Sequence, residues 1–221
     1  MTLPRDEVLP GFFAELAQVE QLIRSLDDRQ WQAASRCEGW RVADVAAHVT
    51  GQLVDITDGR LEGLGTPEAT EREVAERRHL TPAQLADELH GAAEKAAALG
   101  ATFTDEAWKG PAPTDVVPTL GEGIEGLWYD AWVHGDDMRS ASDLTPDRGP
   151  GLRASVFHLT TLLDRKGWGP ATLALDGMEE IPVGSGGGRR VTGDARRFVL
   201  AAAGRADPAP LDLDESVNIY R

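Results

Sequence analysis

The chain has 221 residues, of which 37 are acidic and 22 basic, so its formal net charge is −15. A chain of this length can bury a sizeable core, as one large domain or as a medium and a small one. The acidic balance argues against nucleic acid or an anionic membrane surface as a partner, because both require a basic face. The only cysteine, Cys37, excludes an intrachain disulfide and a cluster of thiolate metal ligands.

No stretch of the sequence resembles a targeting or membrane-spanning segment. The N-terminal residues Met-Thr-Leu-Pro-Arg-Asp-Glu do not form a basic segment followed by an apolar one. Nowhere does the chain approach the roughly 18 consecutive apolar residues of a membrane span. We therefore expect a cytoplasmic protein.

Hydrophobic periodicity predicts four amphipathic helices in the first two thirds of the chain. Apolar residues recur every three or four positions over residues 12–26 and again over 42–56, as on one face of a helix. A third helix is expected over 81–100, where a Thr-Pro-x-Gln capping box opens it and a glycine ends it. A fourth is expected over 124–138. Four such helices predict a four-helix bundle over residues 1–145.

A long connection over residues 100–123 separates the third and fourth predicted helices, and it contains three prolines. Loops of this length without secondary structure are uncommon and are often functional. Trp108 lies within it. Two interpretations stay open: the indole covers a pocket, or it packs on the bundle.

The composition changes near residue 146, where prolines and glycines cluster at a domain boundary. Beyond it the pattern predicts a short helix over 152–163 and strands at 171–175 and around 181–183. A final helix is expected over 194–200, with an aspartate as its N-cap. These elements predict a small α/β domain over residues 146–221. The predicted fold class is therefore mainly α, a four-helix bundle followed by a small α/β C-terminal domain.

Two of the five histidines lie where side chains from two helices of a bundle can bind the same metal ion. His48 lies beside the apolar stripe of the second predicted helix. Asp130 and His134 are four residues apart, so they share one face of the fourth predicted helix at the edge of its stripe. Stripe edges line the crevices between helices, where inward-facing His and carboxylate groups build metal sites. A three-ligand set leaves a position open for water or substrate, as in catalytic sites.

These residues also have a less specific interpretation. A carboxylate four residues before a histidine on a helix is commonly a surface pair that contributes a few tenths of a kcal/mol. Asp137 follows His134 by three residues and lies near the same face, where it is expected to orient the second ring nitrogen. Cys37 is expected to be a small residue in the turn before the second helix, because no base that would activate it is identifiable.

Three stretches carry a family resemblance. Residues 35–49 read Ser-Arg-Cys-Glu-Gly-Trp-Arg-Val-Ala-Asp-Val-Ala-Ala-His-Val, a Cys-x-Gly-Trp turn followed by a helix with Asp and then His. Residues 130–141 are similar to a Glu-x-x-x-His-x-x-Asp-x-Arg-x-Ala run, and the tail at 191–205 ends in Gly-Arg. Together they resemble the mycothiol-dependent maleylpyruvate isomerase family, part of the DinB-like group of metal-binding four-helix bundles. The resemblance covers nearly the whole chain.

This resemblance implies that His48, Asp130 and His134 are the protein ligands of a divalent metal, usually zinc. It also implies mycothiol, the cysteinyl pseudo-disaccharide thiol of actinobacteria, as the thiol cosubstrate. The chain departs from the family in two places. Asp130 stands where the family commonly has Glu, one methylene longer, and Arg41 stands where the family favours Ser or Thr. A hypothesis for Arg41 is that it directs an anion-binding group at the site.

The function implied is a metal- and thiol-dependent enzyme acting on a small electrophile. A thiolate generated at the metal would attack the substrate. Its later departure would give cis–trans isomerisation, and its retention would give S-transfer. Two alternatives remain: a metal-dependent hydrolase that activates water, and a non-catalytic DinB-like stress protein that binds metal. A non-haem iron oxygenase also uses two His and one carboxylate, but usually on a β-barrel scaffold.

Overall fold

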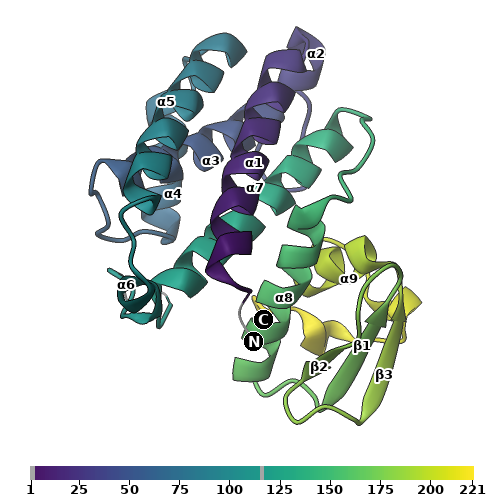
Figure 1. The fold of residues 1–221 in the computed structure, drawn as a ribbon. Helices are drawn as coiled ribbons and strands as arrows, with labels where there is room; N and C mark the ends of the chain where they lie inside the picture. The colour runs from purple at the N-terminus through teal and green to yellow at the C-terminus, as the bar shows by residue number, and fades with distance from the viewer. Residues whose placement is uncertain (1–2, 115–116) are drawn as a thin grey trace. The chain divides into compact units, whose positions relative to one another are not determined.

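The computed structural model describes residues 3–114 and 117–221. The chain divides into two compact units, Arg5–Asp147 and Arg148–Arg221, the second of which also includes the described residues before Arg5. The first unit is helical, and the second combines helices with a three-stranded sheet (Figure 1). This confirms the predicted fold class.

Four long helices form the first unit: α1 (Arg5–Ser25), α3 (Val42–Thr57), α5 (Pro82–Gly100) and α7 (Leu120–Ala141). They correspond to the four helices that the periodicity predicts. α1 packs against α5 and α7, and α3 packs against the same two helices, so the contacts close a ring around one apolar core (Figure 1). Each helix buries its apolar stripe in this core; α1, for example, buries Phe12, Leu16, Val19 and Ile23.

Three shorter helices of this unit were not predicted: α2 (Asp28–Trp31), α4 (Pro67–Arg77) and α6 (Asp105–Lys109). α4 begins with good local signals, because Thr66 accepts a hydrogen bond from a first-turn amide and a proline follows it. Its buried face is not apolar, however, and consists of Ala69, Glu73, Val74 and Arg77. Because half of that face is charged, hydrophobic periodicity does not reveal it.

The connection between α5 and α7 contains α6, and Asp115 and Val116 within it lie outside the described residues. Trp108 is buried. A Cβ built on Gly121, at the start of α7, would stand 2.6 Å from the indole Nε1. Trp108 therefore packs on α7, the second of the two interpretations of this residue.

The second unit consists of α8 (Pro150–Arg165), β1 (Ala171–Leu175), β2 (Ile181–Val183), β3 (Arg189–Gly193) and α9 (Ala195–Ala202). The strand order is β2-β1-β3, with β2 antiparallel and β3 parallel to β1. α8 packs against α9 and β2. Two short 3₁₀ helices follow α9, at Ala209–Leu211 and Glu215–Val217.

β3 was not predicted, because its sequence lacks the alternation of a half-buried strand. Only Val191 of its five residues is buried, and two exposed arginines precede it. Gly193 ends the strand at φ 122°, a conformation that side chains with a Cβ rarely adopt. The strand is held instead by its five paired positions along β1.

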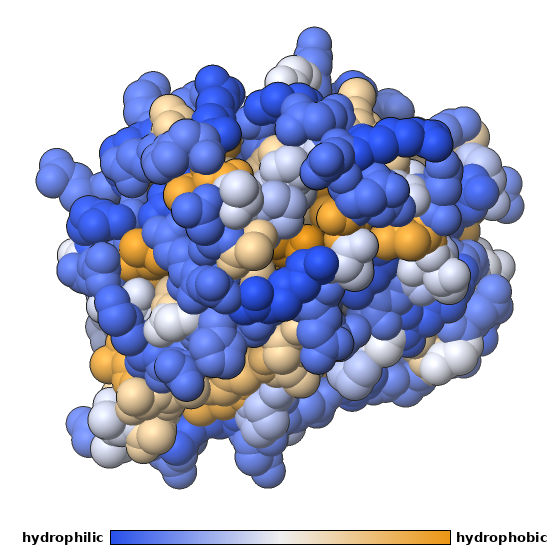
Figure 2. Space-filling view, turned by 90° about the horizontal axis from the view of Figure 1, so that it is seen from above, coloured by the Kyte–Doolittle hydropathy of each residue, from blue (hydrophilic) through white to orange (hydrophobic). Residues whose placement is uncertain are grey.

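The surface view of Figure 2 is largely hydrophilic, with apolar residues showing between the polar side chains. The exposed large hydrophobic residues of the described chain are Leu99, Leu144 and Tyr220. Among the described helices, none is long and apolar enough to cross a membrane.

Candidate metal centre

His48 from α3 meets Asp130 and His134 from α7, and donor atoms of the three side chains all lie within 4.8 Å of one another. The Nε2 atom of His48 is 3.6 Å from Oδ2 of Asp130, and Nε2 of His134 is 3.5 Å from Oδ1 of the same carboxylate. The imidazoles meet edge to face, with centroids 5.1 Å apart. The structure therefore brings together the three residues that the sequence singled out.

These distances match what a tetrahedral metal ion requires of its ligands. With metal–nitrogen and metal–oxygen bonds of about 2.0–2.1 Å, neighbouring donor atoms in a tetrahedron are about 3.3 Å apart. The observed 3.5 and 3.6 Å are slightly longer, and they run to the two different oxygens of the Asp130 carboxylate. Asp130, although one methylene shorter than glutamate, reaches both imidazoles. The three side chains thus fit a divalent ion.

The local sequence explains how the turn before α3 reaches this centre. The Trp40 amide donates to the Cys37 carbonyl at 3.0 Å, and Gly39 adopts φ 79°, a left-handed conformation that favours glycine. The turn places the Trp40 ring 5.5 Å from the ring of His48. The Cys-x-Gly-Trp pattern thus packs an aromatic side chain against one candidate ligand.

A buried carboxylate lies behind each imidazole. Nδ1 of His48 is 2.7 Å from Oε2 of Glu73, and Nδ1 of His134 is 3.2 Å from Oδ2 of Asp137. A carboxylate that accepts the Nδ1 hydrogen fixes the tautomer in which the Nε2 lone pair is available to a metal. Asp137 occupies the position expected from its spacing. Glu73 was missed, because no sequence signal separates it from the many acidic residues of a polar helix.

Gly51 allows α4 to bring Glu73 this close to α3. A Cβ on Gly51 would stand 2.6 Å from Cβ of Glu73 and 2.8 Å from Nη1 of Arg77, closer than real Cβ atoms approach their neighbours. Arg77 in turn binds both carboxylate oxygens of Glu88, at 3.0 and 3.1 Å, and so attaches α4 to α5. A glycine in the middle of a helix is therefore part of the support for His48.

Asp136 and Asp137 are fully buried, and both pair with Arg36. The Arg36 Nε atom lies 3.1 Å from Oδ1 of Asp137, which leaves Oδ2 directed at His134. A buried carboxylate requires such a partner, because desolvation of an unpaired charge is costly. The Cys37 thiol also faces this group, 3.4 Å from Oδ2 of Asp137 and 3.8 Å from Nδ1 of His134. Cys37 is thus more than the small turn residue expected.

Arg41 engages the start of α3 instead of offering an anion-binding group. Its Nε donates to Oδ2 of Asp44 at 3.2 Å, and its Nη1 donates to Gln32 at 2.6 Å. Burial by itself would raise the pKa of Asp44, but the hydrogen bonds and charge of Arg41, together with a hydrogen bond from Arg78, outweigh burial and hold this pKa below its usual value. The hypothesis of an anion site at Arg41 is not supported by these contacts.

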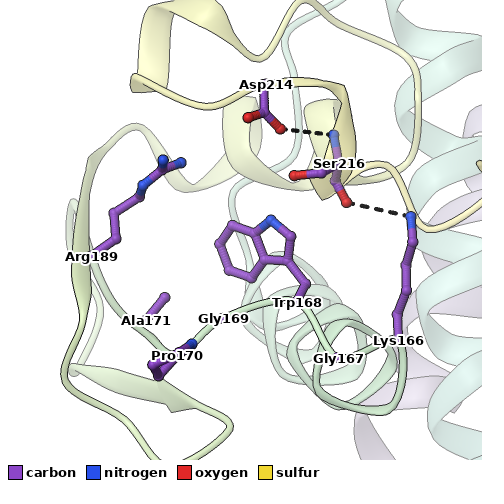
Figure 3. Close-up of a pocket in the computed structure, with 9 residues that line it drawn as sticks. All are labelled: Lys166, Gly167, Trp168, Gly169, Pro170, Ala171, Arg189, Asp214 and Ser216. Atoms are coloured by element: carbon purple, nitrogen blue, oxygen red, sulfur yellow. Dashed lines mark hydrogen bonds between the residues drawn. The ribbon is translucent and has the colours of Figure 1, made fainter.

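A separate cleft of about 500 Å³ lies within the second unit (Figure 3). Trp168 projects into it, and the Lys166 ammonium donates to the backbone carbonyl of Ser216 at 3.3 Å. The other lining residues are Gly167, Gly169, Pro170, Ala171, Arg189 and Asp214. None of the sequence-predicted site residues lines this cleft.

Comparison with known proteins gives the family. The family model described as the mycothiol maleylpyruvate isomerase N-terminal domain matches residues 12–139, more than half of the chain. The chain belongs to this family. The match includes His48, Asp130 and His134, and it confirms the resemblance inferred from the sequence.

Two solved structures share the fold. One is the mycothiol-dependent maleylpyruvate isomerase, with a TM-score of 0.64, and the other is a histidine-to-alanine mutant of that isomerase, with a TM-score of 0.63. Each is 22% identical to this chain, and each alignment covers 96% of both chains. A search of curated proteins finds no match.

Proposed function

We propose that the protein is a metal- and mycothiol-dependent enzyme that isomerises a small electrophile or transfers the thiol to it. The observation that carries this proposal is the convergence of His48, Asp130 and His134 on one point, each within 3.6 Å of a neighbouring donor. Family membership supplies the thiol, and the isomerase named in the related structures supplies maleylpyruvate as the first substrate to test.

A divalent ion at this centre would lower the pKa of a thiol that reaches it and supply Lewis acidity. The protein's own contribution is to hold the ligands. Glu73 and Asp137 accept hydrogen bonds from the Nδ1–H groups of the two histidines, so both Nε2 lone pairs face the centre. Asp130 is the most open of the three, with its side chain 24% exposed against 8% and 10% for the histidines. Substrate and thiol therefore approach from the Asp130 side.

The nucleophile of the reaction is the thiol cosubstrate, so no side chain of the protein forms a bond to the substrate. The thiolate adds to the conjugated double bond, the electron pair moves onto the adjacent carbonyl, and the former double bond becomes free to rotate. Expulsion of the thiolate restores the double bond in the trans form and regenerates the cosubstrate. If the carbanion takes a proton instead, the thiol stays attached and the product is the S-conjugate. Both outcomes use the same nucleophile and the same site.

Elemental analysis and thiol-dependent turnover together test this proposal. We expect about one divalent ion per chain, lost in His134→Ala, and we expect turnover of maleylpyruvate to be lost in both His48→Ala and His134→Ala. His90→Ala is the matched control, because His90 is exposed on α5 and pairs with Glu20. Full metal occupancy in His134→Ala, or full turnover in either ligand variant, would overturn the site. Turnover of an ester without added thiol would support the hydrolase instead.

A further inference from the structure

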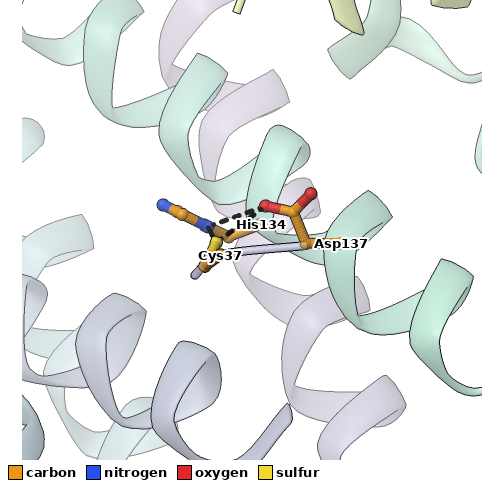
Figure 4. Close-up of side chains that lie close together, drawn as sticks. All are labelled: Cys37, His134 and Asp137. Carbon is orange, nitrogen blue, oxygen red and sulfur yellow. Dashed lines mark hydrogen bonds and ion pairs between the residues drawn. The ribbon is translucent and has the colours of Figure 1, made fainter. Parts of the chain in front are cut away.

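The face of His134 that points away from the metal centre carries a second set of donors. Cys37 comes from the turn before α3, and Asp137 lies one turn beyond His134 on α7. Their donor atoms converge on Nδ1 of His134 (Figure 4), and a thiol, an imidazole and a carboxylate thus lie within 4.8 Å of one another. The sulfur, nitrogen and oxygen donors together are typical of a site for a thiophilic metal ion.

The spacing of these atoms matches one face of a tetrahedron. A zinc–sulfur bond of about 2.3 Å and zinc–nitrogen or zinc–oxygen bonds of about 2.0–2.1 Å place sulfur about 3.5 Å from the other donors, and nitrogen about 3.3 Å from oxygen. The observed distances are 3.4 Å for sulfur to Asp137, 3.8 Å for sulfur to His134 and 3.2 Å for nitrogen to oxygen. The geometry requires shifts of only a few tenths of an ångström.

The surroundings also suit an ion at this position. Asp137 is fully buried and is held from behind by Arg36 through its other oxygen, so Oδ2 remains directed at the thiol and the imidazole. Cys37 is only partly buried, which gives an ion a path from solvent. A bound cation would replace the weak thiol-to-carboxylate hydrogen bond with coordination by a thiolate.

We propose that Cys37, His134 and Asp137 form a second metal site, which takes a thiophilic divalent ion and excludes metal from the first centre. The exclusion follows from the imidazole of His134. Coordination through Nδ1 leaves the ring hydrogen on Nε2, where it blocks ligation beside His48 and Asp130. When the ion binds, the Cys37 thiol proton leaves to solvent, and the His134 hydrogen moves from Nδ1 to Nε2. Metal binding by these three side chains can be measured without any turnover.

Cadmium titration of the metal-free, full-length protein tests this inference. Cys37 is the only cysteine, so the ultraviolet charge-transfer band of a cadmium-bound thiolate reports this side chain directly. We expect a saturable band in the wild type. Asp137→Asn and His134→Gln should each weaken the cadmium affinity by about tenfold or more, because each removes a donor. His48→Ala is the matched control, since it removes a ligand of the competing first centre only and should not weaken the cadmium affinity.

Two results would overturn the inference. Equal cadmium affinity in the wild type, Asp137→Asn and His134→Gln would mean that the thiol binds cadmium without its neighbours. Two tightly bound ions per chain, with the charge-transfer band at full strength, would refute mutual exclusion. The inference is supported by one cadmium ion per chain, with the charge-transfer band at full strength in the wild type and a weaker cadmium affinity in Asp137→Asn and His134→Gln. Circular dichroism of each variant separates loss of a ligand from loss of the fold.

Discussion

The hydrogen bond from His48 to Glu73 gives the sharpest prediction about the metal centre. Glu73 is 1% exposed, and its Oε2 lies 2.7 Å from Nδ1 of His48. In Glu73→Gln the side chain keeps its size and loses its charge. The bond then becomes a neutral one, about half as strong. The new amide group can also donate to Nδ1, which moves the ring hydrogen to Nε2 and stabilises the tautomer that cannot bind metal there.

The expected effect is a weaker metal complex in a folded protein. Loss of a carboxylate behind a metal-binding histidine typically costs 10–100-fold in metal affinity, or about 1.4–2.7 kcal/mol. The stability of the metal-free protein should not fall, because a buried charge has been replaced by a neutral group of the same shape. Competition with a chromophoric chelator measures the affinity, and urea unfolding measures the stability.

Glu76→Gln provides the control, because Glu76 lies on the exposed side of the same helix with its side chain 49% exposed. Its metal affinity should equal that of the wild type. If Glu73→Gln binds metal as tightly as Glu76→Gln does, then Glu73 does not set the tautomer of His48. If both variants lose metal to the same extent, the negative charge of α4 acts at long range and the specific hydrogen bond is unimportant.

Three further predictions follow from neighbouring features. Gly51→Ala places a Cβ 2.6 Å from Glu73, so overpacking should outweigh the gain in helix propensity; we expect a net loss of about 1 kcal/mol in urea unfolding and weaker metal binding. Asp130→Asn should lose metal in elemental analysis while Asp130→Glu retains it, and equal retention would remove Asp130 from the ligands. Burial and the nearby charge of Asp147 raise the pKa of Glu15 from 4.5 to about 7. The native state therefore keeps a proton that the unfolded chain releases between these values, and this group costs stability as pH rises through that window. Glu15→Gln should remove this loss, about 3 kcal/mol at about 1.4 kcal/mol per pH unit, and an unchanged pH dependence of urea unfolding would contradict it.

The parts of the fold that the sequence predicted are those with an apolar stripe. The four long helices bury such stripes, and the helix-edge positions of His48, Asp130 and His134 follow from the same periodicity. The i,i+4 spacing on α7 is enough to place Asp130 and His134 together. The candidate site is complete only because α3 packs against α7. Predicting that contact required the four-helix bundle, which the family resemblance also implies.

The missed features are those whose stabilisation is polar or tertiary. α4 turns a glutamate and an arginine toward the bundle, and a pattern search classifies both as surface residues. The contact of Cys37 with His134 joins residues 97 positions apart, so only the packing of the turn against α7 creates it. The Arg41 side chain is satisfied by Asp44 in the first turn of α3 and by Gln32 just after α2, which the family comparison at one position could not indicate.

The position of Glu73 on α4 also couples ligand affinity to local folding. A helix of 11 residues is too short to persist by itself in water, so α4 depends on its packing against α3 and on the hydrogen bonds from Arg77 to Glu88 of α5. When α4 opens, His48 loses the carboxylate that makes it a good ligand. By thermodynamic reciprocity, a metal that binds more tightly when α4 is closed must hold α4 closed by the same free energy. Amide hydrogen exchange along α4 should therefore slow on metal binding, in proportion to the affinity that Glu73 contributes.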